Sequence, residues 1–299
     1  MLFSNTILQL PLQQVLHPVA IDNEVKLFVL RTDLTDFEIS GNKWFKLKYN
    51  LENAISQGYD TILTFGGAYS NHIHATAAAA SHYNLKSITV IRGEEPENLS
   101  STLLYAKSKG THLHFISREQ YRQKTDTKFL KSLEEKFGKI YIIPEGGSNS
   151  FALEGTSEIP TFINIEYNYL CCAVGTGGTL AGISDKIRNE NIEVIGFPAL
   201  KNGDFLLNDI ADLLENYNGL DLPQNLSLNT DYHFGGYAKT KPELIEFIQN
   251  FEADFKIPLE QVYTGKMMFG IIDLISKKRF KKGSTIIAIH TGGLQGKNV

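Results

Sequence analysis

Short β-branched runs alternate with helical patterns along almost all of this 299-residue chain, and this alternation is the strongest constraint on its fold. The runs have strand length, and the segments between them repeat apolar residues every three to four positions. Such alternation is typical of an α/β protein with mainly parallel, doubly wound sheets. The predicted strands are 25–30, 61–65, 87–91, 112–116, 140–143, 169–174, 194–199 and 285–289. The predicted helices are 43–56, 71–83, 101–109, 119–137, 179–189, 242–255 and 266–278.

The chain is long enough for two domains. With 42% hydrophobic residues it can bury one large core or two modest ones. A compact βαβ series begins after Phe45 and ends near residues 144–147. We therefore expect a small domain of residues 46–148, and a larger domain formed by residues 1–45 together with 149–299.

Composition excludes several classes of function. A net charge of −4 gives no basic footprint, so no nucleic-acid partner is expected. The only cysteines, Cys171 and Cys172, are adjacent in a predicted strand and point to opposite faces, so neither a structural disulfide nor a metal site is expected. The first twenty residues lack the pattern of a signal peptide, and no apolar run is long enough for a membrane span. We expect a cytoplasmic protein with no membrane contact.

Three short segments combine chemistry that one ligand can explain. The first is Gly-Asn-Lys at residues 41–43, where a predicted helix begins. The second is Gly-Gly-Ala-Tyr-Ser-Asn-His at residues 66–72, on the turn after a predicted strand. The third is Gly-Thr-Gly-Gly-Thr at residues 175–179, on the turn after another strand.

Together these segments offer a lysine amine, a hydroxyl and amide pair at a helix start, and a glycine nest suited to a phosphate. Pyridoxal phosphate needs an amine for its aldehyde, a partner for its ring hydroxyl and a cradle for its phosphate. The chain is therefore interpreted as an enzyme of amino-acid chemistry with this cofactor. The larger domain, which carries Lys43 and the glycine loop, is then the cofactor-binding one.

The glycine loop alone allows other interpretations. Backbone N–H groups at a helix start form an anion site, and a Cβ on Gly177 is expected to crowd a bound phosphate. The loop lacks the ending of a P-loop, and Leu180 breaks the dinucleotide-binding fingerprint. Glu193, the candidate ribose contact, begins the next strand instead of ending it, so dinucleotide binding is disfavoured. A tight turn without a ligand is the plain alternative.

The other candidate residues also have ordinary structural interpretations. Lys46 and Lys48 are expected to be solvated, whereas Lys43 follows a turn that can aim it inward. Ser70 and Asn71 suit a helix N-cap, which also presents free N–H groups to a carboxylate. Most tyrosines are packing residues. We expect structural roles for the histidines when each is taken alone, namely His72, His74, His112, His114 and His290.

Taken together, the motifs resemble one family of pyridoxal-phosphate enzymes. It includes 1-aminocyclopropane-1-carboxylate (ACC) deaminase and D-cysteine desulfhydrase, and it shares fold type II with the tryptophan synthase β subunit. The likeness runs from about residue 25 to residue 293, and its order of motifs is specific although no single motif is. Its anchors are residues 31–33, 41–43, 67–72, 175–179, Tyr237, 262–266 and 290–293. The resemblance implies two α/β domains with the cofactor in the cleft between them, a small amino-acid substrate and a homodimer.

The resemblance also implies roles for individual residues. Lys43 would be the lysine that bonds the cofactor aldehyde, and Asn71 would bond the ring hydroxyl. Thr264 would face the pyridine nitrogen beside Thr291. The phosphate would be held by Gly175, Thr176, Gly177, Gly178 and Thr179. The substrate would lie against Ser70, Asn71, His72, Tyr237 and Tyr263, with Ser70 and the two tyrosines as catalytic groups.

Two positions separate the family's activities. The ACC deaminases that this chain resembles carry glutamate at the position of Thr264 and leucine at the position of Thr291. A carboxylate at the pyridine nitrogen favours its protonation and a stronger electron sink, which opening a cyclopropane needs. A hydroxyl suffices for eliminating a thiolate from the β-carbon. His72, where the deaminases have glutamine, points the same way, so β-elimination is favoured over ring opening.

Departures from the family pattern leave the substrate open. Tyr69 stands where glutamine is usual, and His74 stands where desulfhydrases have arginine. ACC deaminase and another fold type II lyase acting on L-serine or L-threonine are the alternative activities. A non-catalytic phosphate-binding α/β protein is the distant rival, and it leaves Lys43 unexplained.

Overall fold

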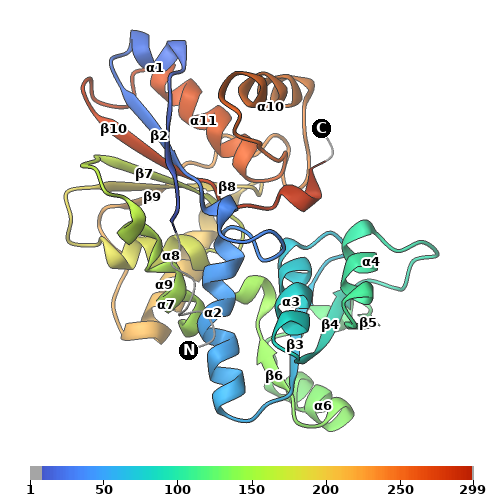
Figure 1. The fold of residues 1–299 in the computed structure, drawn as a ribbon. Coiled ribbons are helices and arrows are strands. Elements are labelled where there is room, and N and C mark those ends of the chain that lie inside the picture. The colour runs from blue at the N-terminus through green and yellow to red at the C-terminus, as the bar shows by residue number, and fades with distance from the viewer. Residues whose placement is uncertain (1–8, 298–299) are drawn as a thin grey trace.

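The computed structural model describes residues 9–297, which form two mainly parallel β-sheets surrounded by helices (Figure 1). Residues 1–8 and 298–299, which the sequence analysis assigns to the larger domain, lie outside the described residues. The predicted α/β class is confirmed, because only β1 (Leu12–Val15) and β2 (Lys26–Leu30) pair antiparallel among the described strands. All other described pairs are parallel, as strand–helix–strand connections require.

The larger sheet has six strands in the order β1-β2-β10-β7-β8-β9. Besides β1 and β2 it contains β10 (Thr285–Ile289), β7 (Tyr169–Val174), β8 (Glu193–Pro198) and β9 (Leu226–Leu228). Alternate residues of β7 face opposite cores. Cys172 packs into one apolar cluster and Cys171 into the other, and both thiols are free and buried. A central strand covered by helices on both faces explains the unbroken apolar run in the sequence.

The smaller sheet has four parallel strands in the order β5-β4-β3-β6. They are β5 (His112–Ile116), β4 (Lys86–Arg92), β3 (Thr61–Gly66) and β6 (Tyr141–Ile143). All four lie within the predicted small domain, residues 46–148, whose boundaries stay a prediction. In Figure 1 this sheet occupies the lower right, the larger sheet the upper left, and α2 (Asn42–Ser56) runs between them.

Every predicted helix is present in the structure, but one of them is divided in two. The single helix expected over 119–137 is two, α5 (Arg118–Tyr121) and α6 (Thr127–Phe137). Asp126 caps α6 by accepting from the N–H groups of Lys128 and Phe129, so its side chain starts a new helix there. The sequence analysis also missed β1, β9 and three helices. Besides α2, the α-helices of the described residues are α1 (Pro18–Asp22), α3 (Asn71–His82), α4 (Ser101–Ser108), α5, α6, α7 (Ser150–Thr156), α8 (Gly178–Lys186), α9 (Leu206–Asn218), α10 (Pro242–Phe255) and α11 (Thr264–Ser276). Of these, α1, α7 and α9 were not expected.

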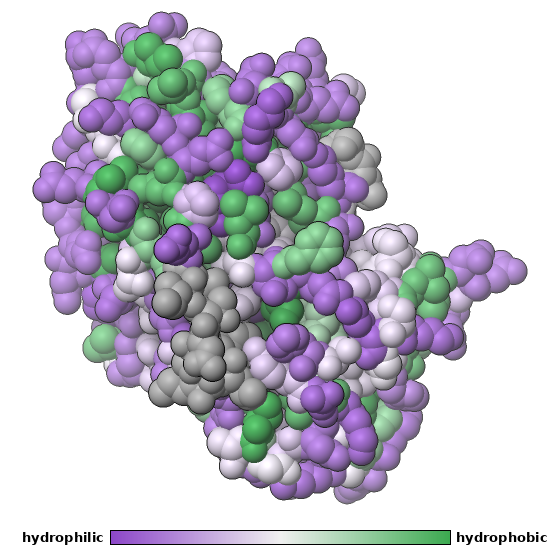
Figure 2. Space-filling view, viewed as in Figure 1, coloured by the Kyte–Doolittle hydropathy of each residue, from purple (hydrophilic) through white to green (hydrophobic). Residues whose placement is uncertain are grey.

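The surface is mainly polar in the view of Figure 2, with apolar groups more frequent over the half built on the larger sheet. Within residues 9–297, no helix combines the length and the apolar character that crossing a bilayer requires. The apolar side chains lie mostly in cores between sheets and helices.

Glycine brings α2 and α7 into close contact. A Cβ on Gly155 of α7 would lie 1.9 Å from the carbonyl oxygen of Phe45 in α2. The two backbones therefore touch, and this contact sets the position of the helix that carries Lys43.

We expect Gly155→Ala to destabilise the fold by about 3 kcal/mol, because the methyl group overlaps backbone atoms that no rotamer change can move. The urea midpoint of unfolding should fall with an unchanged slope. Glu154→Ala, one position away on the exposed face, is the control and should change stability by less than about 0.5 kcal/mol. Equal stabilities of the two variants would show that the helices can separate at no cost.

Candidate active site

A cavity of about 430 Å³ lies between the carboxyl ends of strands from the two sheets. Open α/β sheets place ligands at this edge because the loops after the strands converge there. The cavity brings together all but one of the predicted site residues. Those lining it are Lys43, Ser70, Asn71, His72, Gly175, Thr176, Gly177, Gly178, Thr179, Tyr237, Tyr263 and Thr291. Thr264 is the exception, being fully buried behind the wall.

The start of α2 is pinned to the end of β10. Gly41 has φ +68°, and its N–H donates to the Thr32 carbonyl oxygen at 3.0 Å. A Cβ on Gly41 would lie 2.2 Å from the Thr291 carbonyl oxygen, so only glycine fits. The next N–H, of Asn42, donates to that same oxygen at 3.2 Å. These contacts fix the backbone from which Lys43 projects into the cavity.

The lysine amine is held in a polar corner of the cavity. Lys43 Nζ donates to Asn42 Oδ1 at 2.9 Å, and Asn42 Nδ2 donates to Thr179 Oγ1 at 2.8 Å. The amide therefore links the lysine to the glycine loop. Burial lowers the pKa of Lys43 to about 8, because the charged form loses its hydration. A substantial fraction of neutral amine near pH 7 makes this lysine a better nucleophile than a solvated one.

The second segment forms the turn between β3 and α3. Ser70 caps α3, its Oγ accepting from the Ile73 N–H at 3.4 Å. Asn71 Oδ1 accepts from Gln295 Nε2 at 2.7 Å, so the C-terminal segment holds this amide at the cavity wall. The first N–H groups of a helix have no acceptor within the helix, and here they face the cavity beside Ser70. This end of α3 can bind an anion.

His72 is a buried acceptor. Thr64 Oγ1 gives its hydrogen to the Ile143 carbonyl at 2.9 Å, so it accepts from His72 Nε2 at 2.8 Å. The ring proton is thus on Nε2, and Nδ1 keeps a lone pair with no partner among residues 9–297. Burial, with the charges of Lys43 and Lys46 nearby, lowers the pKa of His72 well below its usual value. This ring stays neutral and can accept a hydrogen bond.

The third segment needs its glycines for space. A Cβ on Gly178 would lie 2.7 Å from Ser148 Oγ, and one on Gly175 would lie 3.2 Å from the Tyr263 ring. Gly177 has φ +79°, and its Cβ would meet Ile210 Cγ1 at 2.8 Å. Crowding of a phosphate by a Cβ on Gly177 stays a prediction, while backbone conformation and packing against Ile210 already favour glycine there. The loop before α8 is an open cradle.

Lys46 is a site residue that the sequence analysis missed. It is 2% exposed, not solvated as expected, and its Nζ donates to the Gly146 carbonyl at 2.6 Å and to Ser148 Oγ at 3.0 Å. Thr176 Oγ1 lies 3.5 Å from the same nitrogen, so the ammonium stands beside the glycine cradle. Burial, followed by repulsion from Lys43, lowers its pKa well below the usual value. Its spacing three residues after Lys43, on the same helix face, was the available signal.

The two tyrosines meet across the cavity. The rings of Tyr237 and Tyr263 pack edge to face with centroids 6.1 Å apart. Burial raises the pKa of Tyr263 well above its usual value, and a hydrogen bond with Tyr237 adds to the shift. The Tyr263 phenol therefore keeps its proton at neutral pH, and the hydroxyls of both tyrosines can donate a hydrogen bond to a ligand.

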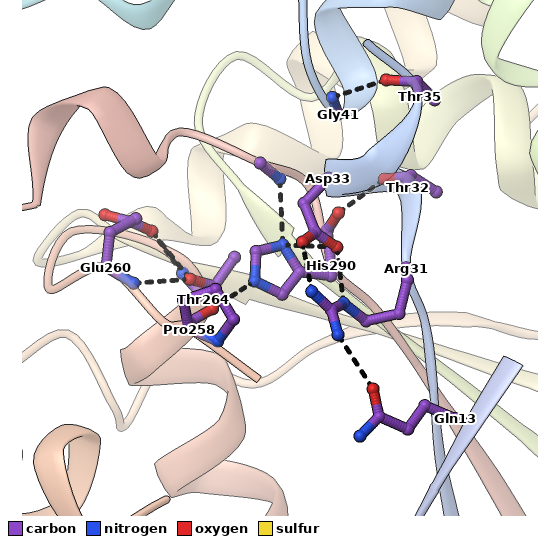
Figure 3. A network of polar contacts seen from close by, with 11 residues as sticks. Gln13, Arg31, Thr32, Asp33, Thr35, Gly41, Pro258, Glu260, Thr264 and His290 are labelled. Carbon is purple, nitrogen blue, oxygen red and sulfur yellow. Dashed lines mark hydrogen bonds and ion pairs between the residues drawn. The ribbon is translucent and has the colours of Figure 1, made fainter. Parts of the chain in front are cut away.

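Thr264 contacts a buried carboxylate instead of the cavity (Figure 3). Its Oγ1 accepts from the Glu260 N–H and lies 3.1 Å from Glu260 Oε1, to which it donates. The carboxylate also accepts from the N–H groups of Val262, Tyr263 and Thr264. Burial raises the pKa of Glu260, while these four hydrogen bonds lower it. The predicted contact of Thr264 with a pyridine nitrogen stays a prediction.

A polar network behind the site joins β2 to β10 (Figure 3). Asp33 binds Arg31 through two hydrogen bonds, at 2.9 and 2.7 Å. His290 Nε2 lies 2.6 Å from the Pro258 carbonyl, which can only accept, so this nitrogen carries the ring hydrogen. Its Nδ1 then accepts from the Gly292 N–H at 3.3 Å. The role of His290 is structural, as expected: it supports the strand end on which Gly41 rests.

The arrangement fits pyridoxal phosphate. It offers an amine of lowered pKa, a glycine cradle with an ammonium beside it, an amide at the wall and an orphan acceptor on His72. A Cβ at Gly175 or Gly178 would press on Tyr263 or on Ser148 and Lys46 in the wall of the cavity. Four kinds of polar group thus converge on one cavity, which suits a cofactor with an aldehyde, a hydroxyl and a phosphate.

Comparison with known proteins agrees with this geometry. The profile of the family described as "Pyridoxal-phosphate dependent enzyme" matches residues 5–292. A bifunctional D-cysteine desulfhydrase/1-aminocyclopropane-1-carboxylate deaminase, mitochondrial, from Arabidopsis thaliana is 34% identical and covers 92% of this chain and 74% of its own. A D-cysteine desulfhydrase from Klebsiella pneumoniae is 29% identical, covering 90% and 87%. The crystal structure of an ACC deaminase homologue superposes with a TM-score of 0.85 at 30% identity, covering 97% and 90%.

We expect covalent attachment of pyridoxal phosphate to be fastest above pH 8. Only the neutral amine attacks an aldehyde, and a pKa of about 8 leaves about one tenth of Lys43 neutral at pH 7. The rate of borohydride-trapped attachment to cofactor-free protein should rise with pH to a midpoint near 8. Lys43→Ala is the control and should trap nothing at this site. A midpoint near 10 would mean that the lysine is solvated.

We expect Lys46→Met to bind pyridoxal phosphate about 10- to 100-fold more weakly, because a charge-assisted hydrogen bond contributes about 1.5–3 kcal/mol. Binding of pyridoxal, which has no phosphate, should change little, and the difference between the two ligands locates the charge. Lys48→Met, which breaks the ion pair with Glu158 outside the cavity, is the matched control. Equal losses for both ligands would show that Lys46 acts through folding alone.

Proposed function

We propose, on the premise that this chain belongs to the family of pyridoxal-phosphate dependent enzymes, that it eliminates a β-substituent from a small D-amino acid, with D-cysteine as preferred substrate. Membership rests on a family match over most of the chain and on the 34% identical relative. It confirms the predicted cofactor, enzyme class and fold type II architecture, within the group of ACC deaminases and D-cysteine desulfhydrases. The choice of substrate is our inference from the site residues.

The observation that carries the proposal is a pair of hydroxyl residues, Thr264 and Thr291. The ACC deaminases that this chain resembles have glutamate and leucine at these two positions. Thr291 lines the cavity and Thr264 lies in its second layer. A site without a carboxylate of its own at residue 264 is a weaker electron sink, which suits departure of a good leaving group such as a thiolate.

Each part of the cofactor has a candidate partner in the cavity. Lys43 would bind the aldehyde carbon, Asn71 the ring hydroxyl, and the N–H groups of residues 175–179 with Lys46 the phosphate. When bound, the cofactor holds the amino group of the substrate and withdraws electrons from its α-carbon. The protein supplies the remaining positioning and proton transfer.

The substrate carboxylate fits the start of α3, where free N–H groups and Ser70 Oγ face the cavity. The Lys43 amine, whose pKa burial lowers, would serve as the base that takes up the α-proton of the substrate. The buried Tyr263 phenol keeps its proton, and this hydroxyl and that of Tyr237 beside it can donate to the departing sulfur. His72 Nδ1 is an acceptor that helps to orient a donor of the ligand.

The ring-opening alternative is supported by one contact. Glu260 Oε1 lies 3.1 Å from Thr264 Oγ1, so a carboxylate stands one hydrogen bond behind the threonine. Through that hydrogen bond, Glu260 can supply part of the negative charge that the glutamate at the position of residue 264 would supply in the ACC deaminases that this chain resembles. ACC deaminase activity is therefore the second candidate.

We expect D-cysteine to give sulfide, pyruvate and ammonia in equal amounts, with little 2-oxobutanoate from ACC. The three products should be measured separately, with L-cysteine and L-serine as stereochemical and leaving-group controls. Efficient release of 2-oxobutanoate, with D-cysteine inert, would overturn the proposal and establish the deaminase alternative.

We expect a triple variant, Thr264→Glu, Thr291→Leu and Glu260→Gln, to shift the product ratio towards 2-oxobutanoate. The third change is required because Glu260 Oε1 lies 3.1 Å from Thr264 Oγ1, so a second buried carboxylate at residue 264 would repel that of Glu260. The matched control carries Thr264→Gln in place of the glutamate, which keeps the shape without the charge. Identical ratios in both variants would mean that charge at residue 264 does not select the reaction.

A further inference from the structure

Lys266 of α11 is buried with its ammonium inside a ring of backbone carbonyl groups. The side chain is 2% exposed. Its Nζ donates to the carbonyl oxygens of His233 and Gly236, both at 2.8 Å, and lies 3.5 Å from that of Ala199. These three oxygens come from two separate segments: the end of β8 and the loop that precedes α10.

No carboxylate pairs with this charge among residues 9–297. Burial lowers the pKa of Lys266 to about 8, against the raising effect of the Glu260 carboxylate. A buried ammonium held only by neutral oxygens is costly, so it is retained where the contacts that it makes are needed. The ammonium occupies the ring as a bound cation would.

The loop held by Lys266 has an unusual backbone and few hydrogen bonds of its own, among them that of the Gly235 N–H with His233 Nδ1. Four of its residues have positive φ, which L side chains rarely adopt: Phe234 (53°), Gly235 (100°), Gly236 (119°) and Ala238 (54°). Its backbone closes only two internal turns, Gly236 N–H to His233 O and Lys239 N–H to Gly236 O. Both acceptor oxygens also bind Lys266. The ammonium therefore joins the residue that precedes the segment 234–238 to the residue at its centre.

This loop presents Tyr237 to the cavity. Tyr237 is 45% exposed and contacts Tyr263, which precedes the first residue of α11. Lys266 lies three residues after Tyr263 on that helix. One helix thus carries one tyrosine directly and holds the other through the ammonium, so the separation of the two rings depends on Lys266.

We propose that Lys266 is a positioning residue whose ammonium, by filling the carbonyl ring of residues 199, 233 and 236, fixes the loop that presents Tyr237. The expected effect of Lys266 on turnover rests on the proposed role of Tyr237. The effect of Lys266 on the loop does not rest on that role, and it can be measured without any substrate.

The test compares Lys266→Ala with the parent by hydrogen exchange of the peptide covering residues 230–241, in protein loaded with cofactor. Exchange should speed up at least tenfold there and stay unchanged in α11 beyond residue 268. n-Propylammonium completes the side chain that alanine lacks, so it should restore slow exchange, whereas 1-propanol should not. Parent protein with the same amine is the reference, because free amines also react with the cofactor aldehyde. Lys277→Met, an exposed lysine at the end of α11, is the matched control.

Turnover is measured on the same samples. We expect a fall of at least tenfold in kcat with cofactor affinity within twofold, since Lys43 and the phosphate cradle lie elsewhere, and recovery with n-propylammonium. Unchanged exchange in Lys266→Ala, or slowing by propanol as well as by the amine, would overturn the proposal. If Tyr237→Phe keeps parental turnover, the proposed role of Tyr237 fails while the exchange result still decides the role of Lys266.

Discussion

The active cavity depends on one contact between backbones: residue 41 lies against the carbonyl group of Thr291, at a distance that only glycine permits. This contact joins the start of α2 to the end of β10 in the larger sheet. It places Lys43 at the carboxyl edge of that sheet, while the rest of α2 runs towards the smaller one (Figure 1). A second contact of this kind lies one turn further along α2, where Gly155 of α7 touches the carbonyl group of Phe45. The lysine is therefore positioned by rigid elements and not by a loop.

Three lysines are desolvated around this framework, and each has a different kind of partner. Among residues 9–297, the Lys43 ammonium hydrogen-bonds only to the Asn42 amide, and burial lowers its pKa. Lys46 has a carbonyl and a hydroxyl, and it stands beside an open cradle for an anion. Lys266 has a closed ring of carbonyls and no space for a ligand. The chemistry available to each ammonium follows from what surrounds it, not from burial alone.

Much of the fold could be predicted, because strand identity here is a local property. Runs such as 169–174 are buried on both faces and are apolar without interruption. The break at Asp126 and the three-residue strand β9 were missed for the opposite reason: each depends on a single cap or on a neighbouring strand, which periodicity does not record. The motif residues gathered around one cavity because strand ends of parallel sheets converge.

The sequence analysis did not separate Lys46 from Lys48, although only Lys46 has the three-residue spacing that places it on the same helix face as Lys43. The contacts that bury Lys46, with Gly146 and Ser148, come from the tertiary structure. The sequence also could not show that the Thr264 side chain is turned towards the Glu260 carboxylate, four residues earlier, and not towards the cavity. That carboxylate folds back over the start of α11 and accepts from three N–H groups as well as from the threonine hydroxyl. A motif names residues, but their hydrogen-bond partners come from the tertiary structure.

The Glu260 contact also limits what the threonine can do for a cofactor. A hydroxyl has one hydrogen, and that of Thr264 is given to Glu260 Oε1. In this state the predicted contact with the pyridine nitrogen can only be one in which the threonine accepts, which requires a protonated nitrogen. If Glu260 takes up a proton, as burial favours, the carboxyl can donate to the threonine and release its hydrogen towards an unprotonated nitrogen. On the predicted contact, the protonation of the pyridine nitrogen would depend on both residue 264 and the protonation of Glu260. The two residues must therefore be considered as one unit.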